Sequence, residues 1–299
     1  MWPQIITSVV VLAVMAHVIL LSCAYLIFLE RKVAAWCQDR LGPNRTNFSF
    51  GLDAIWSKIP GMGAIMKKRH FGLGQALADG LKLFMKEDYT PPHVEKALFL
   101  LAPILAVVPA MLAWAVIPWG GMIEQGAQLL PDFLGGYTLS ELVRVTVAPI
   151  DLALIYVLAI GSTAVYAVVV GGYSSNNKYA FLGGLRGTAQ MLSYEIPQGL
   201  CVLIMILMYS TANADYLVSA QSGLIAADGT GVWGIVLQPV LAVIFFTCVL
   251  AECNRAPFDL VEAEQALVGG YHTAYSSMKW ALFFLGESRH MITGCGNFV

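Results

Sequence analysis

Long apolar runs, each followed by a polar segment, dominate this chain of 299 residues. A helix that crosses a membrane needs about 20 mainly apolar residues. Five runs have that length: residues 5–29, 97–117, 146–170, 189–211 and 232–250. A sixth run begins near Met278, meets Glu287 and reaches the last residue, Val299, before a full crossing. The pattern predicts an all-α polytopic membrane protein with about five complete transmembrane helices and a partial sixth.

Composition agrees with that class. Hydrophobic residues make up 58% of the chain and charged residues 12%, whereas soluble domains are roughly 45–50% apolar. The net charge of −2 gives no basic surplus that would indicate nucleic acid. The six cysteines have no CxxC or other ligand spacing, so we expect neither zinc nor an iron–sulfur cluster in this chain. Residues 1–4 contain no lysine or arginine, and the first run is too long for a cleaved signal peptide.

The basic residues predict how the chain is oriented. Eleven of the 17 lysines and arginines lie in residues 30–96, between the first two runs. The segment between the second and third runs has only Arg144, and the segment between the fourth and fifth has none. Positive charge accumulates on the cytoplasmic side. We therefore expect a single membrane domain over residues 1–299, with its N-terminus outside, a large cytoplasmic loop at 30–96 and an acidic cytoplasmic loop at 251–279.

An amphipathic helix is predicted within the first cytoplasmic loop, near residues 72–87. Its apolar positions fall on one stripe of a helix; they are Leu73, Ala76, Leu77, Leu81, Phe84 and Met85. The opposite face carries Gln75, Asp79, Lys82 and Lys86. Such a helix suits the membrane interface, although it could equally be a surface helix that only anchors the loop.

A carboxylate lies inside the fourth run. Glu195 is followed by Pro197, which removes a backbone donor and tends to kink a helix. Ionisable residues inside a membrane are costly and tend to be functional. Glu195 is therefore a candidate for ion or proton handling.

Four carboxylates and one arginine gather between Glu252 and Glu264, where the fifth run leaves the membrane. Asp259 and Glu262 are three residues apart and share a face if the segment is helical. Acids this close repel one another when all are ionised, so they can share and pass protons. Arg255 can hold one or two of them as anions. The alternative is an ordinary solvated acidic loop.

Several motifs together identify a family. They are Glu30-Arg31-Lys32-Val33 with Gly42-Pro43-Asn44-Arg45, Ala78-Asp79-Gly80-Leu81-Lys82-Leu83-Phe84, Gly183-Gly184-Leu185-Arg186, Ser193-Tyr194-Glu195-Ile196-Pro197, the stretch from Glu252 to Glu264, and Gly270-Tyr271-His272-Thr273 through Leu285. In this order they resemble the H-subunit (also called subunit 1) of the proton-pumping NADH–quinone oxidoreductase, respiratory complex I. No G-x-G-x-x-G or Walker A pattern indicates a nucleotide site in the chain itself.

The resemblance implies a role for particular residues. Subunits of this family form most of the tunnel through which quinone, such as ubiquinone, reaches the complex, and they begin the acidic path that couples its reduction to proton translocation. The resemblance implies quinone-tunnel positions at Arg31, Arg40, Asp79, Arg186 and Arg255. It implies proton-path positions at Glu195, Glu252, Asp259, Glu262, Glu264 and Glu287.

It also implies the surroundings of the chain. Quinone would be a substrate, and the flavin and iron–sulfur clusters that take electrons from NADH would lie on partner subunits. Those partners would be the peripheral-arm subunits at the quinone site and the antiporter-like membrane subunits. The location would be the cell inner membrane.

Two features depart from the family pattern. About twenty extra residues lie between Gly51 and Gly74, and we hypothesise that residues 56–70 pack on the cytoplasmic leaflet beside the quinone entrance. The family continues for about two helices beyond its sixth, and this chain stops inside the sixth. A fragment, a separate polypeptide for the remainder or a shifted reading frame would each produce such an end.

Other functions stay open at this point. An equivalent subunit of a membrane-bound hydrogenase-type complex would share these motifs. A secondary ion transporter would show internal repeats with broken helices in both halves, and the chain shows one interrupted helix without a repeat. A scaffold without activity is a further alternative.

Overall fold

Helices dominate the structure, a computed structural model that describes residues 2–47, 72–120, 122–123, 143–223, 233–255, 257–259, 261 and 268–298. The helices are α1 (Trp2–Cys37), α4 (Gln75–Met85), α5 (Lys96–Ala113), α6 (Ala153–Thr163), α7 (Val165–Ser174), α8 (Lys178–Tyr209), α9 (Ala214–Gly223), α10 (Gly234–Leu237), α11 (Pro239–Glu252), the 3₁₀ helix η2 (Gly270–His272) and α13 (Ser277–Phe298). The strands β1 (Met122–Ile123) and β2 (Val143–Arg144) form one short antiparallel pair. The predicted all-α class is confirmed.

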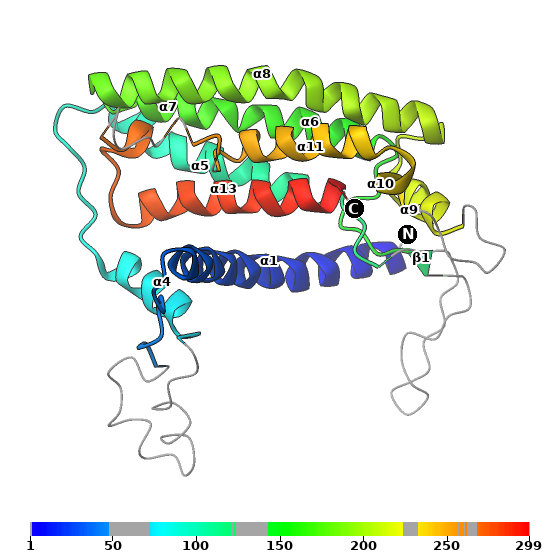
Figure 1. Ribbon diagram of the computed structural model, residues 1–299, viewed down its shortest axis with the longest axis horizontal. Helices are drawn as coiled ribbons and strands as arrows, with labels where there is room; N and C mark the ends of the chain where they lie inside the picture. The colour runs from blue at the N-terminus through cyan, green and yellow to red at the C-terminus, as the bar shows by residue number, and fades with distance from the viewer. Residues whose placement is uncertain are drawn as a thin grey trace, which may run out of the picture.

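The long helices lie side by side as a bundle, with α8 along one side and α1 along the other (Figure 1). Four described helical segments are long and apolar enough to cross a membrane: residues 4–37, 96–113, 153–174 and 178–209. Helix α11 is apolar but shorter. Helix α4 lies at the end of the bundle where α1 ends, and the β1–β2 pair lies at the opposite end (Figure 1). These features make the chain a polytopic membrane protein.

Two helices extend further than the apolar runs predict. Helix α8 begins at Lys178, eleven residues before the predicted start, and continues through Pro197. The Asn177 side chain caps it by accepting a hydrogen bond from the backbone N–H of Tyr179. Helix α13 has 22 residues and passes through the polar stretch at 287–290 without a break. In both helices, packing inside the bundle outweighs the local signals for a boundary.

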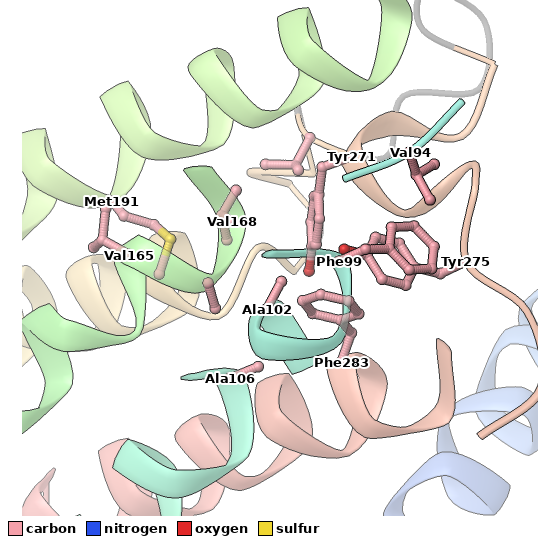
Figure 2. Packing of buried hydrophobic residues seen from close by; sticks show 12 residues of the cluster. Val94, Phe99, Ala102, Ala106, Val165, Val168, Met191, Tyr271, Tyr275 and Phe283 are labelled. Atoms are coloured by element: carbon pink, nitrogen blue, oxygen red, sulfur yellow. The ribbon is translucent and has the colours of Figure 1, made fainter. Parts of the chain in front are cut away.

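A buried cluster holds the α4 end of the bundle together. Figure 2 shows Phe99 of α5 and Tyr275, whose rings stack with centroids 4.0 Å apart. Phe283 of α13 packs edge-on against Tyr271 and Tyr275. Burial raises the pKa of Tyr275 to about 12, so its hydroxyl stays protonated and pairs with the Ser174 hydroxyl at 3.2 Å.

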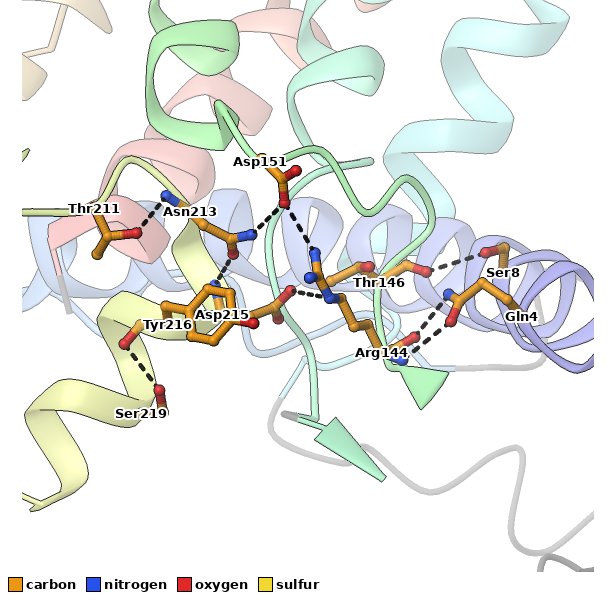
Figure 3. Close-up of polar contacts among 10 residues, drawn as sticks. All are labelled: Gln4, Ser8, Arg144, Thr146, Asp151, Thr211, Asn213, Asp215, Tyr216 and Ser219. Carbon is orange, nitrogen blue, oxygen red and sulfur yellow. Dashed lines mark hydrogen bonds and ion pairs between the residues drawn. The ribbon is translucent and has the colours of Figure 1, made fainter. Parts of the chain in front are cut away.

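A polar network ties elements together at the other end of the bundle (Figure 3). The Gln4 side chain exchanges two hydrogen bonds with the backbone of Arg144, which connects α1 to β2. The Arg144 guanidinium lies 3.5 Å from Asp151 and 3.9 Å from Asp215. The Asn213 side-chain amide donates to Asp151 at 2.9 Å. Burial raises the pKa of Asp215, and Arg144 offsets part of that rise.

Glycines let α8 approach its neighbours closely. A Cβ on Gly184 would lie 3.4 Å from the α-carbon of Gly172 in α7. A Cβ on Gly183 would lie 2.9 Å from the α-carbon of Gly270. Small residues at such contacts let membrane helices pack backbone to backbone.

Replacing Gly183 with alanine is expected to destabilise the protein by about 1–3 kcal/mol, because the new methyl group meets backbone that cannot move aside. Gly199→Ala in the same helix is the matched control, since its Cβ would have no neighbour within 4 Å. That control should be neutral or should stabilise the helix by up to about 1 kcal/mol. Unfolding of the purified protein in mixed detergent micelles measures both values. Equal stability of the two variants would contradict the close contact.

Candidate functional site

The end of α1 is joined to α4 by an ion pair. The Arg31 Nη1 atom lies 2.5 Å from Asp79 Oδ2. The Gln75 side-chain amide, one helical turn earlier on α4, donates to the other Asp79 oxygen at 2.8 Å. The stripe predicted for this segment becomes α4, and its apolar residues Leu77 and Phe84 are 54% and 72% exposed. This apolar face is therefore free to meet lipid, a hydrophobic ligand or a partner.

A second ion pair joins the same end of α1 to the loop after α11. Arg255 Nη1 donates to Glu30 Oε1 at 2.7 Å. Its Nη2 lies 3.5 Å from the Ser288 hydroxyl of α13, and its guanidinium covers the Phe284 ring at 5.1 Å. Arg255 thus connects α1 to α13, through Glu30, 225 residues earlier in the sequence, and Ser288, 33 residues later.

Gln190 of α8 fixes the backbone of that loop. Its side-chain amide donates to the carbonyls of Ala251 and Phe258, both at 2.8 Å. Asn254, between them, takes a left-handed conformation with φ of 49°. The apolar pattern does not single out Gln190, although it is one of two glutamines on the buried, glycine-rich side of α8, and that is a usable signal.

A cavity of about 370 Å³ lies inside the bundle and brings two of the predicted acids together. Glu195 of α8 and Glu252 of α11 both line it, with Gln198, Gln221 and Gln238. The glycine at 161 brings α6 close to Glu252, because a Cβ there would lie 3.3 Å from the carboxylate oxygen Oε1. The rest of the lining is mainly apolar, so water in the cavity would sit at these carboxylates and glutamines, where it can carry protons between the acids.

Glu287 lies in the middle of α13. The Tyr271 hydroxyl donates to its Oε1 at 2.9 Å. Both residues line a second, smaller cavity of about 20 Å³, which Glu252 also borders. Glu195, Glu252 and Glu287 therefore surround two neighbouring spaces in the bundle interior.

Three of the remaining predicted site residues are exposed: Arg40, Arg186 and Asp259. Arg40 and Arg186 are exposed and form no ion pair with another described residue. Asp259 is exposed in the loop after α11. Glu262 and Glu264, like the extra segment at 52–71, lie outside the described residues. Their predicted roles remain predictions.

The polar stretch of α13 contributes two residues, Arg289 and His290, that are not among the predicted site residues. Arg289 is 4% exposed, and its Nε and Nη1 atoms have no hydrogen-bond acceptor among the described residues. Its guanidinium lies against the Cys23 thiol of α1. His290 borders both cavities. Charged and polar residues at this depth indicate function more often than packing.

Together, the fold and the site define a polytopic membrane protein in which ionisable residues extend from the membrane boundary into the helix bundle. The sequence matches the NADH dehydrogenase family over residues 9–299. It is 40% identical over 277 residues to the NADH-quinone oxidoreductase H-subunit 1 of Geobacter sulfurreducens, covering 93% of this chain and 71% of the relative. It is 38% identical over 294 residues to the corresponding H-subunit of Leptospira biflexa, covering 98% and 73%.

The chain belongs to the family of NADH-quinone oxidoreductase H-subunits. It is therefore a membrane subunit of a multi-subunit oxidoreductase, respiratory complex I, and acts as part of that assembly. The family named from the motifs is confirmed.

Proposed function

We propose that the chain forms the quinone-access tunnel of NADH-quinone oxidoreductase and the first part of its proton-coupling path. One observation carries the proposal: ion pairs from two adjacent residues at the end of α1 link this helix to α4 and to Arg255, which also reaches α13. Asp79 pairs with Arg31, the neighbouring Glu30 pairs with Arg255, and Arg255 reaches Ser288 beside Glu287. A change at a quinone near α4 could therefore act on the acids inside the bundle.

The quinone part of the proposal rests on the α4 end of the bundle. A quinone needs an apolar channel for its tail and a few polar groups for its headgroup. The exposed apolar stripe of α4 would contact the quinone tail. The polar groups for the headgroup would be Asp79, Arg31 and Arg255. We place Arg40 and Arg186 in the same tunnel, where they would complete it with partner subunits.

The proton part rests on the acids around the two cavities. Glu195, Glu252 and Glu287 lie in a setting where charge is poorly solvated, so the ionisation of one should affect the others. We assign Asp259, Glu262 and Glu264 to the cytoplasmic start of this path. Each proton that enters the path would move between carboxylates through water in the cavities.

The rest of the reaction belongs to partners. We propose that peripheral-arm subunits carry the flavin and iron–sulfur clusters that deliver electrons from NADH to quinone. Antiporter-like subunits would continue the proton path, and the complex would reside in the cell inner membrane. The names of the relatives, which are NADH-quinone oxidoreductase subunits, support this assignment over a hydrogenase or a transporter.

Replacing Glu195 with glutamine is expected to lower proton translocation and quinone reduction about fivefold, on the order of 1 kcal/mol in activation free energy. Glutamine keeps the size of the side chain and removes its titratable proton. Both rates are measured with the assembled complex in proteoliposomes, after assembly is checked on a native gel. Glu95→Gln, an exposed acid at the start of α5, is the control. Normal rates in Glu195→Gln, and also in Glu252→Gln, would contradict the proposed path.

A further inference from the structure

His290 of α13 lines both of the cavities described above. It lines the 370 Å³ cavity with Glu195 and Glu252, and it lines the 20 Å³ cavity with Glu252 and Glu287. The smaller space has room for about one water molecule. Among these four residues, His290 and Glu252 border both spaces, and they come from different helices.

We infer that His290 is a proton-transfer residue that connects Glu252 and the larger cavity to Glu287. The inference rests on the proposed function, because it adds a step to that proton path. Protonated Glu252 would release its proton to one imidazole nitrogen, directly or through water. The other nitrogen would then release a proton through water to the Glu287 carboxylate, which leaves neutral imidazole in its other tautomer. Rotation of the ring, or proton exchange with water in the cavities, then restores the starting form of His290.

The chemistry of the side chain suits this step. The Nε2 atom of His290 is buried and has no hydrogen-bonding partner among the described residues. Imidazole can accept a proton on one nitrogen and donate from the other. A water molecule in either cavity would give Nε2 the partner that it lacks.

The packing of α13 directs His290 to this position. Gly286, His290 and Gly294 are spaced four residues apart and so share one face of the helix. A Cβ on Gly286 would lie 3.0 Å from the Ala106 carbonyl of α5, and one on Gly294 would clash with Val249 of α11. The two glycines let this face press against both neighbouring helices, which leaves His290 at their junction.

Burial disfavours the charged imidazole, so the protonated form of His290 is a transient intermediate in the proposed step. Glu252 comes from α11, Glu195 from α8 and Glu287 from α13 itself, and a nearby carboxylate favours the charged form of histidine. The Tyr271 hydroxyl of η2 donates a hydrogen bond to Glu287. Two cations lie near this region: Arg289, the adjacent residue, packs against Cys23 of α1, and Arg255 is at Ser288. The three acids therefore outnumber the two cations.

Chemical rescue tests the inference in the assembled complex. His290→Ala is expected to lower proton translocation and quinone reduction about fivefold, a modest loss for an acid–base group because water can carry part of the flux. Added imidazole should restore most of both rates, since the adjoining cavity can admit it. Pyrazole has the same shape but does not titrate near neutral pH, so it should not restore them. His93→Ala, an exposed histidine, is the control.

Several results would overturn the inference. Unchanged rates in His290→Ala would do so, and so would equal restoration by pyrazole, which would assign His290 a packing role. If neither compound restores activity, the pH–rate profile of His290→Asn decides. Loss of one limb relative to the unsubstituted complex supports proton transfer, and an unchanged profile contradicts it. An effect of Glu195→Gln without any effect at His290 would reject this inference and leave the proposed function standing.

Discussion

Replacing Arg255 with alanine is expected to lower quinone reduction by the assembled complex about thirtyfold, on the order of 2 kcal/mol. The guanidinium contacts Glu30 of α1 and both Phe284 and Ser288 of α13, and the side chain is only 18% exposed. Its removal would break the side-chain contacts between the α4 end of α1 and helix α13, which carries the cavity acid Glu287. NADH-driven quinone reduction in proteoliposomes, with thermal melting of the complex, measures the effect.

Arg255→Lys should recover only part of the activity. Lysine keeps the charge for Glu30 but cannot contact Glu30 and Ser288 with two separate nitrogens. Arg45→Ala serves as the control, because Arg45 is exposed and its side chain forms no ion pair with another described residue. Normal quinone reduction in Arg255→Ala would mean that this contact does not transmit the effect of quinone.

Reversing one charge of the Arg31–Asp79 pair should raise the KM for quinone about tenfold, equivalent to about 1.4 kcal/mol. Arg31→Asp leaves two acids facing each other, and Asp79→Arg leaves two bases, so each pushes α4 away from α1. The double variant restores opposite charges and should recover most of the loss, since the pair is partly exposed and its geometry is adaptable.

Steady-state kinetics with a soluble short-chain quinone give KM for all three variants. Lys82→Asp, on the same face of α4, controls for the change in net charge. An unchanged KM in both single variants would contradict a quinone tunnel at this end of the bundle.

The sequence was a good guide to the helices, because a span in a membrane must satisfy its own backbone hydrogen bonds and expose apolar side chains. It also indicated α4, where the stripe of Leu77, Leu81 and Phe84 stands opposite Asp79. It was weaker at boundaries. Helix α8 starts eleven residues earlier than its apolar run, because Gly183 and Gly184 pack against neighbours and do not end the helix.

The sequence predicted individual site residues, but it did not predict which of them contact one another in the fold. Glu30 and Arg255 lie 225 residues apart, and Arg31 and Asp79 lie 48 apart. Periodicity reports which face of a helix a residue occupies, but not which other helix that face meets. The meeting of Glu195 and Glu252 at one cavity likewise depends on the packing of α8 against α11.

Helix α1 is anchored near both of its ends, by Gln4 to the backbone of Arg144 and by Glu30 to Arg255. Its span-forming stretch of 34 residues measures about 51 Å, whereas the hydrocarbon layer is about 30 Å thick. The excess has to be taken up by tilt or by extension into the headgroups. Because Gln4 and Glu30 hold α1 to other parts of the same chain, α1 cannot tilt by itself without straining these contacts. A change in lipid thickness is therefore expected to change the stability of the Glu30–Arg255 contact.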